Sequence, residues 1–279
     1  IAQALEPVLN GKELCAQLAA QARPAVWFKT YLADGESGIA LGHTKLGGLP
    51  DLPAGLPWPQ RSAYPDVAQR GKYPRASERA HAWRLGAEFP LNFLAQINFA
   101  EVWAAGPLDE DFPRSGLLSV FYDLTEKPWG DEPTDALGLQ VLYHDEPGVP
   151  LRRLPLPEAL QVLPPHWHLQ ELACELHACW TPLSFATVQW REVAQTLSRD
   201  QQDSYADWRF DENGNAASAD GMDWCCHHLG GWPNPIQSEM QTQCALVDAG
   251  ISCSNGDAFR DVQTKAVRDT ADQWVLLLQ

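Results

Sequence analysis

One short turn sequence occurs twice in this chain, and this repeat constrains the fold more than any other feature. The segment 46–51, LGGLPD, reappears 183 residues later as the segment 229–234, LGGWPN. A glycine pair permits a tight turn with positive φ, and the proline fixes the direction in which the chain leaves it. We therefore expect two corners of one shape, the first corner (46–51) and the second corner (229–234). They share Gly47, Gly48 and Pro50 in the first and Gly230, Gly231 and Pro233 in the second.

A Leu-x-Gln sequence follows each corner at the same distance. The segment 94–96, LAQ, lies in an apolar stretch, and the same offset leads to the segment 277–279, LLQ. A buried glutamine must find hydrogen-bond partners, and the backbone of the corner in its own copy is the nearest candidate. We predict that Gln96 and Gln279 fasten each corner to its strand. This structural role is favoured over contact with a ligand, because most buried polar side chains satisfy backbone groups.

The repeat predicts an α+β protein with largely antiparallel sheets, an internal pseudo-two-fold duplication and short peripheral helices. Copy one covers about 40–145 and copy two about 222–279, within a single domain of residues 1–279. No low-complexity linker divides the chain. The strand GLLSVFYDL that follows the first Leu-x-Gln segment has no counterpart after Gln279. We therefore expect the second copy to be incomplete at its C-terminus.

Hydrophobic periodicity and turn residues locate the individual elements. Three apolar stretches bounded by turn residues predict neighbouring antiparallel strands at 90–99, 116–124 and 138–145. Further strands are expected at 25–33 and 274–279. Two short helices with a break at Asn10-Gly11 are expected within 2–22, and further helices at 168–179, 190–210 and 256–272. The segment 61–84 is rich in arginine and poor in core residues, which predicts an exposed insertion.

The acidic charge balance limits the classes of partner. Asp and Glu number 36 against 20 Lys and Arg, which gives a formal net charge of -16. Nucleic-acid binding is disfavoured because it depends on Lys and Arg displacing counterions. No stretch reaches the length of a membrane span. Seven scattered cysteines do not form a disulfide framework, so we expect a reducing compartment and a cytoplasmic location.

Two groups of cysteine and histidine raise the question of a metal site. Cys225-Cys226-His227-His228 supplies four adjacent ligand types, but adjacent residues do not readily converge on one tetrahedral ion. The second group is better spaced, because Cys174 and His177 would share one face of a helix. Small buried cysteines and surface histidines remain the favoured interpretation, so we predict neither metal nor cofactor, with structural zinc as an alternative. The second group comprises His166, His168, Cys174, His177 and Cys179.

Motifs for common reactions are missing from the sequence. It contains no GxSxG elbow for acyl transfer, and neither GxxxxGK[ST] nor GxGxxG for phosphate binding. The acidic runs 109–111 and 131–132 are typical of solvated loops in an acidic protein. We therefore assign no catalytic residues. The candidate binding residues are Trp58, Gln96, Asp123, Trp129 and His228.

Several segments, taken in order, resemble the signature segments of the YwqG-like family of bacterial proteins. They are KLGGLPDLPAGLPWP, PLNFLAQINF, GLLSVFYD with the later Trp129-Gly130, HHLGGWPNPIQ and WVLLLQ, and together they span roughly 40–279. The resemblance implies one α+β unit with internal pseudo-symmetry on largely antiparallel sheets. It implies no established reaction. The basic segment 61–84 and the lack of a closing strand after Gln279 depart from the family pattern.

These observations favour a non-catalytic, acidic binding protein. Its most concrete form is an immunity protein that neutralises a basic bacterial toxin, because negative charge accelerates association with a basic partner. The alternative is an enzyme or small-ligand-binding protein that uses a groove between the two copies, where Trp58, Gln96, Asp123 and His228 converge. One concentrated acidic face would favour the protein partner, and a deep pocket containing histidine and carboxylate would favour an enzyme.

Overall fold

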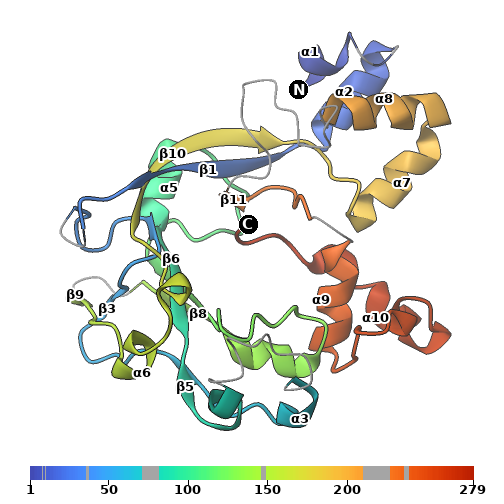
Figure 1. The fold of residues 1–279 in the computed structure, drawn as a ribbon. Helices are drawn as coiled ribbons and strands as arrows, with labels where there is room; N and C mark the ends of the chain where they lie inside the picture. The colour runs from blue at the N-terminus through green and yellow to red at the C-terminus, as the bar shows by residue number, and fades with distance from the viewer. Residues whose placement is uncertain are drawn as a thin grey trace.

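A curled, seven-stranded antiparallel sheet forms the centre of the molecule (Figure 1). The computed structural model describes residues 1–7, 9, 11–35, 38–70, 82–145, 149–209, 227–235 and 239–279. Its strand order is β11-β1-β10-β2-β6-β7-β8, and two further sheets pair β3 with β9 and β4 with β5. Short helices surround these sheets, so the α+β class predicted from the sequence is confirmed.

The strands of the large sheet differ greatly in length. They are β1 (Arg23–Leu32), β2 (Lys45–Leu46), β6 (Asn92–Asn98), β7 (Leu117–Tyr122), β8 (Leu139–His144), β10 (Leu172–Thr181) and β11 (His228–Gly230). The small sheets contain β3 (Asp51–Pro53), β4 (Gln60–Arg61), β5 (Phe89–Pro90) and β9 (Leu151–Arg153). The predicted neighbours β6, β7 and β8 pair antiparallel in that order, as their sequences indicate.

The long pair β1 and β10 lies between the edge strand β11 and the short strand β2. These strands remain in register from Arg23 opposite Thr181 to Leu32 opposite Leu172. β11 pairs with β1 near one end, where Ala25 faces Gly230, and β2 pairs with β10 near the other, where Leu172 faces Leu46. The two corners therefore extend from opposite ends of the same antiparallel pair.

The helices are short, and most lie at the periphery. Asn98 begins the helix after β6, because its side chain accepts the backbone N–H groups of Ala100 and Glu101. In Figure 1, α1, α2, α7 and α8 gather into one lobe, and α9 lies beside α10. The α-helices are α1 (Ala2–Leu5), α2 (Lys12–Ala20), α3 (Val67–Arg70), α5 (Phe99–Ala105), α6 (Glu158–Gln161), α7 (Val188–Thr196), α8 (Arg199–Arg209), α9 (Met240–Asp248) and α10 (Lys265–Arg268). No helix among the described residues is both long and apolar enough to cross a membrane.

Separate hydrophobic clusters hold these layers together. One cluster packs α5 against the large sheet, with Phe99 and Val102 meeting Val26 and Ile97. A second joins Phe93 and Phe121 of the sheet to the segment 154–167. A third fills the lobe of α1, α2, α7 and α8. Burial of these side chains supplies the main favourable term for folding.

Three predicted elements differ from the structure. The expected helix at 168–179 is wrong, because residues 172–181 form β10 and pair along their whole length with β1. The expected helix at 190–210 divides at Leu197 into α7 and α8. The segment 256–272 forms three 3₁₀ turns, of which the last extends to Gln273, and the four-residue helix α10.

The prediction of an exposed insertion at 61–84 is also wrong for the part that the structure describes. Arg61 and Arg84 are buried, and Tyr64 is buried beside Arg61. Residues 71–81 of this segment lie outside the described residues. The error arose because the acceptors of these arginines, Asp123 for Arg61 and the Thr125 hydroxyl for Arg84, come from a distant part of the chain.

Candidate functional site

The two corners make the same backbone hydrogen bonds to their strands. The Gly47 N–H donates to Leu94 O at 2.7 Å, and the Gly230 N–H donates to Leu277 O at 3.0 Å. All four corner glycines have positive φ, between 66° at Gly47 and 75° at Gly231. The residue before each Leu-Gly-Gly run pairs with the glutamine. Lys45 pairs with Gln96 between β2 and β6. The backbones of His228 and Gln279 exchange two N–H···O hydrogen bonds of 2.9 Å each.

The glutamine side chains make the contacts predicted from the sequence. Gln96 Oε1 accepts the backbone N–H of Asp51 at 2.8 Å, and Gln279 Oε1 accepts that of Asn234 at 2.7 Å. Gln96 is 0% exposed, and its amide also donates to His43 O at 2.8 Å. Each glutamine thus fastens the residue after the corner proline to the strand behind it.

The side chains beside the glutamines differ between the corners. In the first corner, buried Lys45 contacts Glu171 at 3.1 Å, and Arg153 Nε contacts Asp51 Oδ1 at 2.8 Å. In the second corner, histidine and asparagine take the positions of the lysine and aspartate. Burial lowers the pKa of His228, and its Nδ1 donates to Gly230 O at 2.9 Å. The first corner is therefore ionic and the second neutral.

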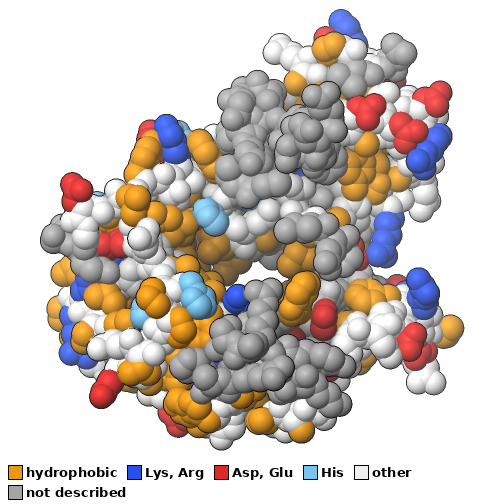
Figure 2. Space-filling view, viewed as in Figure 1, with side chains coloured by type: hydrophobic (Ala, Val, Ile, Leu, Met, Phe, Trp, Pro, Cys, Tyr) orange, Lys and Arg blue, Asp and Glu red, His pale blue; other side chains and the backbone are white. Residues whose placement is uncertain are grey.

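A largely apolar hollow, here called the groove, lies beside the first corner and the C-terminal segment 277–279 and has a volume of about 700 Å³. Figure 2 shows its opening near the middle of the molecule, with hydrophobic side chains in its wall. The sheet curls so that the edge strand β8 and the C-terminal segment 277–279 both line it. Its lining consists of Leu46, Gly47, Leu94, Ala95, Val120, Leu139, Val141, His168, Leu169, Gln170, Leu172, His227, Leu277, Leu278 and Gln279.

The predicted binding residues do not meet in this groove. Trp58 packs edge-on against Phe121 in another cluster and donates to Leu91 O at 2.7 Å. Gln96 and His228 are buried and hold the corners, while Trp129 is 76% exposed away from the groove. The groove itself is present, but the expected convergence of Trp58, Gln96, Asp123 and His228 within it is wrong.

Sequence reasoning missed the apolar residues that line the groove. The sequence candidates were chosen as groups of polar side chains. The lining on β8 consists instead of Leu139 and Val141, which alternate with more buried residues. The alternation marks one face of a strand. No local pattern shows that this face meets the C-terminal segment, since the meeting depends on the curl of the whole sheet.

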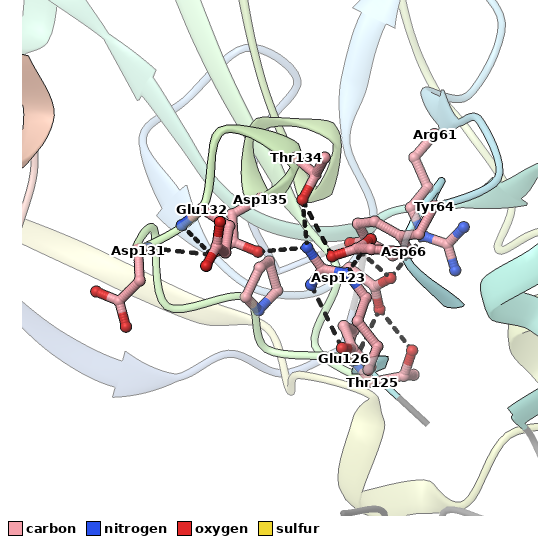
Figure 3. Close-up of polar contacts among 12 residues, drawn as sticks. Arg61, Tyr64, Asp66, Asp123, Thr125, Glu126, Asp131, Glu132, Thr134 and Asp135 are labelled. Atoms are coloured by element: carbon pink, nitrogen blue, oxygen red, sulfur yellow. Dashed lines mark hydrogen bonds and ion pairs between the residues drawn. The ribbon is translucent and has the colours of Figure 1, made fainter. Parts of the chain in front are cut away.

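Asp123 lies in a carboxylate–arginine cluster below the sheet (Figure 3). Its Oδ2 accepts from Arg61 Nε at 2.6 Å and from the Tyr64 hydroxyl at 3.3 Å. Burial acts to raise the pKa of Asp123, but the Thr125 hydrogen bond and the charge of Arg61 together hold it below its usual value. The ionised carboxylate therefore anchors the 61–64 segment.

Arg70 binds three carboxylates of this cluster. Its guanidinium contacts Asp66 at 2.8 Å, Glu126 at 3.4 Å and Asp135 at 2.5 Å. The other oxygen of Asp135 accepts the backbone N–H groups of residues 130–132. Because its carboxylates are occupied by arginines and backbone donors, the cluster binds protein segments to one another and presents no poised acid–base pair.

The cysteine and histidine groups give no metal site among the described residues, where no group of three or more potential ligands is found. Cys174 and His177 stand on a strand three residues apart, so they point to opposite faces. Burial raises the pKa of the Cys174 thiol to about 12 and that of Cys179 to about 11. Protonated thiols are poor ligands. Cys225 and Cys226 lie outside the described residues.

The matched segment of a known family model includes both corners and both Leu-x-Gln strands. That model, a domain of unknown function called DUF1963, matches residues 44–279. The chain belongs to the DUF1963 family. The DUF1963 match begins beside β2 and leaves out α1, α2 and the long strand β1. A comparison with curated proteins finds no match.

Proposed function

We propose that this DUF1963 protein is a non-catalytic binding protein that holds a small, neutral, mostly apolar molecule in the groove. The observation that carries this proposal is the hollow of about 700 Å³ whose wall combines the first corner, the edge strand β8 and the C-terminal segment 277–279. Small-molecule sites in proteins are typically concave and mostly apolar, with volumes of roughly 300–1,000 Å³.

Exposed apolar side chains in the groove supply the driving force for binding. Leu139 is 47% exposed and Val141 is 42% exposed, although both stand in a regular strand. Leu169, across the groove, is exposed to a similar degree. A ligand that removes this surface from water gains about 25 cal/mol for each Å² of apolar area covered. A contiguous apolar surface of this kind is characteristic of binding sites.

The polar groups in the wall favour an uncharged ligand. They are the imidazoles of His168 and His227 and the amides of Gln170 and Gln279. Two of them are already engaged, since His168 Nε2 lies 2.8 Å from Leu160 O and Gln279 holds the second corner. No Lys or Arg is found among the described lining residues to neutralise a carboxylate or phosphate. A hydroxyl or carbonyl group is therefore the expected polar part of the ligand.

Binding is favoured over catalysis by the same lining. The described wall contains histidines but no Asp, Glu, Ser, Thr or Cys, so it supplies neither a carboxylate partner for a histidine nor a nucleophile. The wall therefore resembles a receptor surface more than a reaction centre.

We include an internal duplication in this proposal, with the groove at the junction of the copies. The matching hydrogen bonds at Gly47 and Gly230 support it, as do those at Gln96 and Gln279. The placement within the YwqG-like group and the cytoplasmic location remain predictions from the sequence.

A basic protein partner, with toxin neutralisation as its concrete form, is the second candidate function. It is favoured by the net charge of -16. It ranks second because, on the face that Figure 2 shows, the acidic side chains are scattered among basic ones. Capture of one basic protein at a stoichiometric ratio, undiminished by filling of the groove, would place this candidate first.

A fluorescence titration tests the groove directly. The neutral probe N-phenyl-1-naphthylamine should bind saturably, and octan-1-ol should displace it more effectively than octanoate. Val141→Asp places a charge in the groove wall and should weaken binding about tenfold or more, equivalent to roughly 1.4 kcal/mol. Val262→Asp is the matched control, because Val262 is exposed on a 3₁₀ turn that does not line the groove. Equal affinity of the two variants would refute the proposal.

A further inference from the structure

A second pocket of about 760 Å³ lies at one end of the large sheet, beside the β3–β9 pair. Asn98, Leu117 and His144 are neighbours across β6, β7 and β8 and form one side of it. Apolar residues on both sides of the pocket, including Leu56 and Leu151, provide a hydrophobic surface. Its lining shares no residue with that of the groove.

A fixed imidazole stands at one side of this second pocket. Glu101 lies in the first turn of α5, and its Oε2 accepts the backbone N–H of Thr44 at 2.8 Å. The other oxygen of Glu101 lies 2.6 Å from His43 Nδ1. The carboxylate therefore holds the ring and occupies Nδ1, which leaves Nε2 as the nitrogen through which His43 can accept a hydrogen bond from a ligand.

Other polar groups of the lining come from the ends of β7 and β8. The Ser115 hydroxyl donates to Asp145 Oδ1 at 2.7 Å, which fixes this second carboxylate. His144 lines the pocket next to it, and its Nε2 is shielded from solvent with no hydrogen-bond partner among the described residues. A buried polar atom without a partner is uncommon and calls for a ligand or water.

The charge of the second pocket selects the kind of ligand. Asp145 is the only Asp or Glu among the described lining residues, which include no Lys or Arg, and the carboxylate of Glu101 lies behind His43. A cation gains from this field, and an anion is repelled. We propose that the second pocket binds a small molecule with a protonated amine on an apolar body, the amine lying between Asp145 and His43.

Three probes of one shape test this assignment by NMR titration of the ¹⁵N-labelled full chain. Phenethylamine should shift the backbone amide signals of Gly42, His43 and Gly116 saturably. 2-Phenylethanol should bind about tenfold more weakly because it lacks the charge, and 3-phenylpropionate should cause no localised shift. Equal binding of the three probes, or amine shifts centred elsewhere, would overturn the assignment.

Charge-removing variants complete the test. Asp145→Asn and Glu101→Gln keep the shapes of the side chains and should each weaken phenethylamine binding about fivefold or more. Glu13→Gln removes the same charge from an exposed position on α2, remote from the pocket, and should leave binding unchanged. If Glu13→Gln weakens binding as much as Asp145→Asn, the effect belongs to net charge and the site is refuted. The dispersion of the amide spectrum of each variant reports independently that the variant is folded.

Discussion

At the residue scale, one glutamine joins each corner to a strand, Gln96 at the first and Gln279 at the second. The role of Gln96 was predictable from sequence, because a polar side chain in an apolar strand must find partners nearby. The burial of Arg61 was not predictable from the sequence. Its partner Asp123 is distant in the chain, and a run of arginines looks solvent-exposed until the carboxylates that receive it are known.

Replacement of these glutamines should have unequal effects on stability. Gln96→Leu leaves the buried Asp51 N–H and His43 O without their partner and should lower the free energy of unfolding by about 2–4 kcal/mol, since each buried unsatisfied group costs roughly 1–3 kcal/mol. Gln279→Leu should cost about 1 kcal/mol, because Gln279 is partly exposed and water can replace it. Urea unfolding measures both changes in the free energy of unfolding. A larger loss of stability in Gln279→Leu than in Gln96→Leu would contradict the proposed role of Gln96.

Asp123 should make stability depend on acid pH. Its pKa is below 3.8 in the folded state, so its contribution is complete above about pH 4 and is lost as the pH falls through the folded pKa. Urea midpoints of the wild type should therefore fall steeply below pH 4. Asp123→Asn should be less stable at pH 7 and should show a shallower fall. Parallel curves for the two proteins would exclude this role of Asp123.

At the element scale, pairing between distant segments decides what the local sequence becomes. The strands β6, β7 and β8 were predictable because turn residues bound each apolar stretch and consecutive strands pair. The strand β10 was mistaken for a helix, because its ten-residue pairing with β1 outweighs a weak local preference. The same pairing shows that β1 belongs to the sheet although it precedes the family match.

Removal of β1 should therefore abolish folding. A chain of residues 44–279, the extent of the family match, lacks the strand that pairs with both β10 and β11. We expect poor dispersion of its amide NMR signals and no cooperative unfolding. A chain of residues 22–279 retains β1 and should keep a dispersed spectrum at reduced stability, because only α1 and α2 are lost. A folded 44–279 chain would show that β1 is dispensable.

At the scale of the whole molecule, the curl of one sheet creates the groove. The repeat predicted a groove between two copies, and the structure contains a hollow lined by the first corner, β8 and the segment 277–279. Its apolar lining could not be predicted, since β8 is one edge strand of the sheet and the segment 277–279 lies beside β11, the other edge strand, and they meet only because the sheet curls. The polar candidates Gln96, Asp123 and His228 are instead buried residues that hold segments of the fold together.

Methyl NMR of the full chain with labelled leucine and valine, titrated with octan-1-ol, tests the central claim most directly. The groove account predicts saturable shifts centred on Leu46, Leu94, Val141 and Leu278, all of which line the hollow. Leu5 and Leu183, in the cluster of the helical lobe, should not move. Shifts that fail to saturate, or that centre on the helical lobe, would contradict the groove as the binding site.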